Sequence, residues 1–82
     1  MKVDVIIERG ESGFYSAYMD YDDFDFGLYG GGYTVEETIK DFLEGKEFMR
    51  ESYKEEGRSF PEDLGFNFKY DVPSFLAYYS VL

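Results

Sequence analysis

The chain has 82 residues, of which 18 are acidic and 8 basic, giving a formal net charge of −10, and it contains neither cysteine nor histidine. The absence of cysteine excludes a disulfide framework and a thiolate metal site. The strongly negative charge repels nucleic-acid phosphates and anionic lipid heads, so we expect no direct nucleic-acid binding and a basic protein as the natural partner.

The length suits one domain over residues 1–82, and its 9 Phe and 9 Tyr residues are a major source of apolar area for a core. No apolar run approaches the roughly 20 residues that a membrane-spanning helix needs, and the N-terminal sequence lacks the apolar segment of a signal peptide. We therefore expect a cytoplasmic protein that does not enter a membrane.

The N-terminal residues predict a β-hairpin. Residues 2–8 alternate apolar and polar side chains over part of their length, as a strand with one buried face does. Residues 9–13 carry two glycines in a turn-forming context, and residues 14–19 are rich in aromatic side chains. The two strands are therefore expected to pair in an antiparallel arrangement.

A loop with four carboxylates follows the hairpin at residues 20–25. A short third strand is expected at residues 26–29, and Gly30, Gly31 and Gly32 form the predicted turn from this strand to a helix. Such a turn brings strand and helix close together and favours glycine because glycine adopts positive φ readily.

Thr34 and Glu37 predict the start of that helix, because a T-x-x-E sequence forms a capping box in which threonine accepts the Glu37 amide and glutamate accepts the threonine amide. Gly57 is suited to the position just after the helix. Apolar residues recur between these two points at helical spacing. They are Val35, Ile39, Phe42, Leu43, Met49 and Tyr53.

The C-terminal part predicts a loop at residues 58–65, a strand at residues 66–71 with strict alternation, and a second helix whose first turn contains Pro73. The second helix carries Phe75, Leu76, Tyr79 and Leu82. It has no stop signal, which favours a sequence cut from a longer protein over a helix that ends in the core. The element order is thus β-β-β-α-β-α, typical of an α+β two-layer fold with one sheet and a crossover helix.

Three short motifs occur in a characteristic order. The sequence Gly-Phe-Tyr-Ser-Ala stands at residues 13–17, Gly27 follows, and Gly-Tyr-Thr-Val-Glu-Glu stands at residues 32–37 before the amphipathic helix. In this order and spacing the chain resembles the HicB-like antitoxin family of bacterial toxin–antitoxin systems. One feature departs from the family pattern, which usually has a proline-containing turn where this chain has residues 20–25.

The resemblance implies a partial RNase H-like fold without the catalytic residues of that nuclease. It implies binding and neutralisation of a small basic HicA-like toxin that cleaves RNA, and assembly into dimers or larger oligomers. Family members commonly carry a C-terminal DNA-binding domain that represses their operon; none fits within this sequence, and if the parent protein has one, it lies beyond Leu82. Because the 20–25 loop differs, the family's choice of partner does not carry over.

The acidic loop has three interpretations: a Ca²⁺ or Mg²⁺ site, a solvated loop, or a docking surface for a basic partner. Its spacing fails the EF-hand pattern, since Phe24 occupies the fifth position and no glycine follows it. A docking role follows from charge complementarity, with aromatic side chains as binding hot spots. The candidate partner-binding residues are Asp20, Tyr21, Asp22, Asp23, Phe24 and Asp25.

Two further patterns have both a functional and a structural interpretation. The glycine run before a helix resembles a phosphate-binding turn, but it lacks a lysine, and glutamates fill the first helical turn. Asp4, with Asp20 or Asp71 beside it, could be the remnant of a two-metal nuclease site or a solvent-facing strand residue. With no histidine or cysteine, we expect a protein that is not an enzyme and needs no metal or cofactor.

The sequence is compatible with two functions. The first is an antitoxin-like domain that covers a basic ribonuclease toxin. The alternative is an oligomerisation or sensing domain of a transcription regulator that has no toxin partner. Rings on more than one side of the second helix predict self-association through Phe75, Tyr78 and Tyr79.

Overall fold

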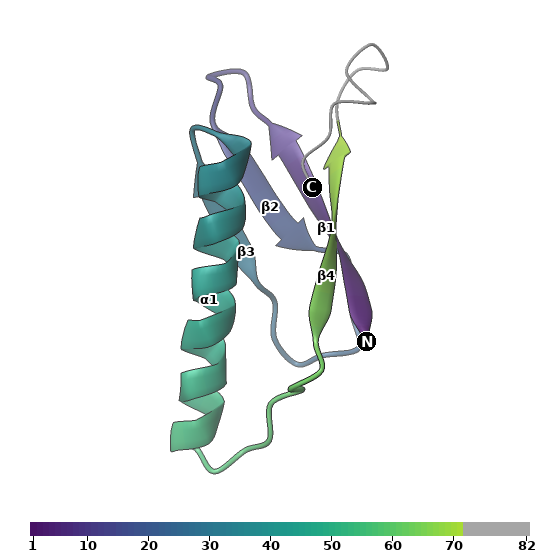
Figure 1. Ribbon diagram of the computed structural model, residues 1–82, viewed down its shortest axis with the longest axis vertical. Coiled ribbons are helices and arrows are strands. Elements are labelled where there is room, and N and C mark those ends of the chain that lie inside the picture. The colour runs from purple at the N-terminus through teal and green to yellow at the C-terminus, as the bar shows by residue number, and fades with distance from the viewer. Residues whose placement is uncertain (72–82) are drawn as a thin grey trace.

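A computed structural model describes residues 1–71 of the chain, with Asp71 described by its backbone (Figure 1). Within this range the elements are β1 (Lys2–Arg9), β2 (Tyr15–Met19), β3 (Tyr29–Gly32), α1 (Val35–Glu55) and β4 (Gly65–Asp71). The described part is therefore α+β, with the predicted strand-strand-strand-helix-strand order.

The four described strands form one mixed sheet in the order β3-β2-β1-β4. β2 pairs antiparallel with both β1 and β3, whereas β4 runs parallel to β1 with Lys2 opposite Gly65. Figure 1 shows α1 lying along the β3 side of the sheet, where it packs mainly on β3 and β2, and its Phe42 also meets Phe66 and Phe68 of β4 edge-on. The expected hairpin and crossover helix are both confirmed.

The buried side chains form two neighbouring clusters. One lies between the sheet and the middle of α1 and contains Val5, Ile7, Ala17, Leu28 and Phe42. The other lies toward the C-terminal end of α1 and contains Val3, Tyr53, Phe60 and Leu64. Alternate residues of β1 enter these clusters, as the pattern of its sequence predicts.

The predicted start of α1 is confirmed, with one change in the capping box. The Glu37 amide donates to the Thr34 hydroxyl at 3.0 Å, as expected. The Glu37 carboxylate, however, accepts from the amide of Tyr33 at 2.9 Å and not from that of Thr34. Thr34 has the extended backbone of an N-cap residue, at φ −132° and ψ 161°, and the carboxylate closes the box one residue before it.

The end of α1 is also as predicted. Gly57 has φ of +70°, and its amide donates to the Lys54 carbonyl at 3.0 Å while the Arg58 amide donates to the Tyr53 carbonyl at 2.8 Å. These two bonds form a Schellman motif, which positions Arg58 beside the last turn of the helix.

The expected position of the third strand is wrong. The strand is Tyr29–Gly32 and includes the three glycines that were expected to form a turn, and none of these glycines has positive φ. The physical reason is close packing, because a Cβ atom on Gly30 would lie 2.6 Å from the Phe42 amide nitrogen. The glycines let α1 approach the strand backbone, so the expected close strand-to-helix contact is present.

The predicted second helix lies outside the described residues. The expected oligomer contacts Phe75, Tyr78 and Tyr79 lie there too, and both predictions stay predictions.

Candidate functional site

The acidic loop, residues 20–25, follows β2 on the way to β3, and its aromatic and acidic side chains point in different directions. Tyr21 and Phe24 are half-buried, whereas the carboxylates of Asp22, Asp23 and Asp25 are exposed. The loop thus packs its rings against the protein and presents its charges to solvent. Asp20 is also exposed, and its amide donates to the Asp4 carbonyl at 2.9 Å, which fixes the start of the loop to β1.

A chain of aromatic contacts holds the loop against the end of α1. The Tyr21 and Phe24 rings lie 4.9 Å apart, and Phe24 stacks on Phe26 with the same centroid distance and an interplanar angle of 5°. Phe26 in turn stacks on Phe60 at 5.2 Å and meets Tyr53 edge-on at 5.7 Å. Such ring pairs stabilise beyond the area that they bury, so this part of the loop has a defined conformation.

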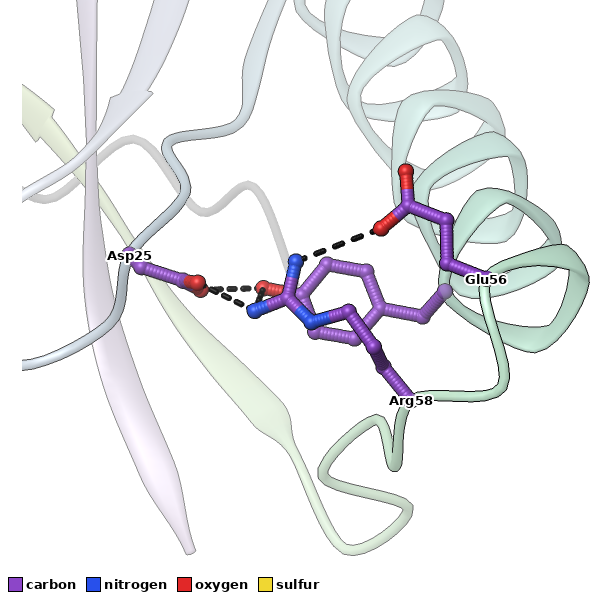
Figure 2. Close-up of polar contacts among 4 residues, drawn as sticks. Asp25, Glu56 and Arg58 are labelled. Carbon is purple, nitrogen blue, oxygen red and sulfur yellow. Dashed lines mark hydrogen bonds and ion pairs between the residues drawn. The ribbon is translucent and has the colours of Figure 1, made fainter.

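Asp25 is joined to the helix end by a polar network (Figure 2). The Tyr53 hydroxyl donates to one carboxylate oxygen of Asp25, and the Arg58 guanidinium donates to the other. Arg58 also lies over the Tyr53 ring, 4.1 Å from its centroid, and donates to Glu56 at 3.4 Å. Figure 2 shows Arg58 between the carboxylates of Asp25 and Glu56.

The network changes the protonation of its members. The hydrogen bond from Tyr53, and then that from Arg58, lowers the pKa of Asp25 below the ordinary aspartate value. The same bond to Asp25 raises the pKa of Tyr53, and the contact with Asp25 raises the pKa of Arg58. All three groups therefore keep the charge state that the network needs at neutral pH.

The surroundings of Tyr21 in the acidic loop change the pKa of its phenol. Partial burial is the largest cause that raises the pKa of Tyr21, and the nearby carboxylate of Asp23 raises it further. The phenol consequently stays neutral beside a negative charge.

All six residues predicted for partner binding lie together because they are consecutive. Their side chains, however, have different surroundings. Asp20, Asp22 and Asp23 offer their carboxylates to solvent, while Asp25 is engaged by Arg58. Tyr21 and Phe24 pack within the protein. The sequence did not indicate that Arg58 and Tyr53 contact the loop. The prediction that Gly57 ends the helix put Arg58 at the helix terminus, but no pattern in the sequence linked Arg58 to Asp25.

The other candidate sites have structural contacts. The Gly31 amide donates to the Asp41 carboxylate at 2.9 Å, so a side chain of the protein occupies that amide. Asp4 forms an ion pair with Lys69 at 2.9 Å. The backbone of Asp71 lies opposite Glu8 rather than Asp4. Within the described residues, no three acidic side chains are grouped in a way that could hold a metal ion.

Comparisons of the chain with protein-family models, with curated proteins and with solved structures find no match. The resemblance to HicB-like antitoxins therefore depends on the order of its short motifs alone. Among the described residues, no helix combines the length and the hydropathy needed to cross a bilayer.

Proposed function

We propose that the chain is an antitoxin-like protein-interaction domain whose acidic loop docks a small basic partner protein. One observation carries the proposal: the loop turns its rings inward and its carboxylates outward, and Arg58 and Tyr53 fix it in that arrangement. The net charge of −10 extends the same sign of potential over the whole molecule.

Loop order and loop charge contribute to different stages of binding. A loop that is already ordered loses little conformational entropy when a partner binds, so more of the contact energy appears as affinity. The exposed carboxylates of Asp20, Asp22 and Asp23 steer a basic protein toward the loop and raise the association rate.

The partner class follows from the resemblance of the motifs. A HicA-like toxin that cleaves RNA is small and basic, and an antitoxin that covers it needs no catalytic residues of its own. We therefore propose a cytoplasmic binding domain that is not an enzyme, related to HicB-like antitoxins. In this proposal residues 72–82 complete a β-β-β-α-β-α, partial RNase H-like fold and contribute Phe75, Tyr78 and Tyr79 to a homo-oligomer.

The proposal predicts a small basic reading frame next to the gene for this chain, and the test uses that reading frame. Its product is expressed alone, with the wild-type chain, and with the variant Asp22→Asn/Asp23→Asn. We expect growth arrest by the basic protein, relief by the wild-type chain, and weaker relief by the variant. In stopped-flow measurements the variant should associate more slowly, with a flatter dependence on salt.

Two results would contradict the proposal. One is a locus without a small basic reading frame; the other is growth arrest that the wild-type chain does not relieve. A stable oligomer without a basic partner, measured by sedimentation, would instead support a self-associating domain of a transcription regulator. The variant Glu44→Gln/Glu55→Gln removes two exposed carboxylates of α1 that lie outside the Arg58 network and serves as the charge-matched control.

A further inference from the structure

A band of aromatic side chains lies on the sheet face opposite α1. Gly30 faces Phe42 of α1, so its neighbours Tyr29 and Gly31 point to the other face. A Cβ atom on Gly31 would lie 2.7 Å from the Phe14 ring, which places that ring against the glycine. Tyr33 meets Phe14 edge-on, with centroids 5.2 Å apart.

Register extends the band across the sheet. Tyr18 on β2 pairs with Tyr29 on β3, and residues opposite one another on neighbouring strands have adjacent side chains. The band is thus Tyr33, Phe14, Tyr29 and Tyr18.

Its rings are unusually accessible. Tyr33 is 72% exposed and Tyr29 is 64% exposed, and no other helix or strand within residues 1–71 packs over them. A domain of this length needs nearly all its large apolar side chains for its core. Rings held on the surface as a group therefore indicate a contact surface for a partner.

One carboxylate on this face of the sheet contacts the band directly, because the Tyr18 hydroxyl donates to Glu8 at 3.3 Å. The cation Lys69, on the same face of the sheet, is paired with Asp4 at 2.9 Å. The band therefore joins ring faces to negative potential, which is the environment that a guanidinium prefers because it stacks on rings and pairs with carboxylates.

We propose that this aromatic band binds arginine side chains of the basic partner protein. The inference rests on the proposed function, and it adds a second contact surface that selects arginine over lysine. The acidic loop attracts any positive charge, whereas a planar and weakly hydrated guanidinium gains more from the tyrosine faces than an ammonium does.

The test compares two peptides of equal charge, octa-arginine and octa-lysine, in calorimetric titrations at about 0.15 M salt, where exposed charges are partly screened. The wild-type chain should bind octa-arginine roughly threefold to tenfold more tightly, the size expected from one or two exposed cation–π contacts. The variant Tyr29→Leu/Tyr33→Leu keeps apolar bulk but removes the phenol rings, so its preference should fall toward one. Circular dichroism confirms that the variant is folded.

Two controls separate this inference from the proposed function. Phe48→Leu removes a ring that is 75% exposed on α1 and should leave the preference unchanged. Asp22→Asn/Asp23→Asn should weaken both peptides equally and keep their ratio. An equal affinity of the wild-type chain for the two peptides, or a preference that survives the loss of Tyr29 and Tyr33, would overturn the inference even if the chain relieves the toxin.

Discussion

Arg58 connects three parts of the chain through its backbone and its side chain. Its backbone closes the Schellman motif after α1, its guanidinium lies over the Tyr53 ring, and its donors reach Asp25 in the loop before β3. An exposed ion pair by itself contributes little to stability. Here the pair also fixes a loop conformation, because the hydroxyl of Tyr53 holds the second oxygen of Asp25.

The lowered pKa of Asp25 predicts a specific dependence of stability on pH. A carboxylate whose pKa is lower in the folded state stabilises the fold above its unfolded pKa, and this contribution is lost as pH falls through the folded pKa. Asp25→Asn should therefore be less stable than the wild-type chain at pH about 7, and the difference should shrink as the pH falls below about 4, the ordinary aspartate value.

Urea unfolding of both proteins across this pH range gives the measurement. Asp22→Asn removes an exposed carboxylate of the same loop and controls for the loss of one negative charge. A difference between wild type and Asp25→Asn that stays constant down to low pH would show that the network does not depend on ionised Asp25.

At this scale the sequence indicated the charges of the site but not their contacts. Four aspartates between two strands are visible as an acidic loop without a structure. The engagement of Asp25 by Arg58 depends on residues that are far apart in the chain and meet only in the fold. Tyr21 and Phe24 illustrate the same point, since composition does not say whether a loop ring points outward or into the core.

At the scale of elements, α1 was predicted at both ends and β3 was misplaced. Caps are local signals, because Thr34 and Gly57 act on amides and carbonyls within a few residues. The strand conformation of the three consecutive glycines, in contrast, does not depend on a local signal. It arises because α1 packs so closely on β3 that a side chain at Gly30 would collide with Phe42.

This contact predicts the outcome of adding one methyl group. Gly30→Ala should destabilise the protein by about 1–3 kcal/mol, because the new Cβ atom meets backbone atoms that cannot move without shifting α1. Gly27→Ala is the matched control, since a Cβ atom there has no neighbour within 4 Å. Chemical denaturation should show a lower midpoint for the first variant and a nearly unchanged midpoint for the second. Equal midpoints would mean that α1 does not approach β3 this closely.

For the molecule as a whole, composition and element order predicted the α+β class and the helix-covered sheet. The strand order and the parallel pairing of β4 with β1 were not predicted, because a crossover helix permits a parallel return strand without saying which strand it joins. The aromatic band was not predicted, because ring counts do not distinguish the two faces of a sheet. Register decides that question, and a shift by one residue would exchange the faces.

The net charge of −10 predicts that salt stabilises the protein. Self-repulsion among unpaired carboxylates opposes the compact state, and the screening length falls from about 30 Å at 0.01 M salt to about 10 Å at 0.1 M. The melting temperature at pH 7 should therefore rise between these two concentrations, equally in sodium and potassium chloride. A lower melting temperature at the higher concentration would mean that the favourable ion pairs outweigh the repulsion.

The parallel pairing of β1 with β4 has a consequence for synthesis on the ribosome. β1 emerges first and can form its hairpin with β2 early, but its other edge stays open until residues 65–71 have been made. Pairing across such a sequence separation is slow compared with local hairpin formation. The nascent chain must therefore keep this edge of β1 unpaired until β4 has been made, and its negative charge would help to keep neighbouring nascent chains apart.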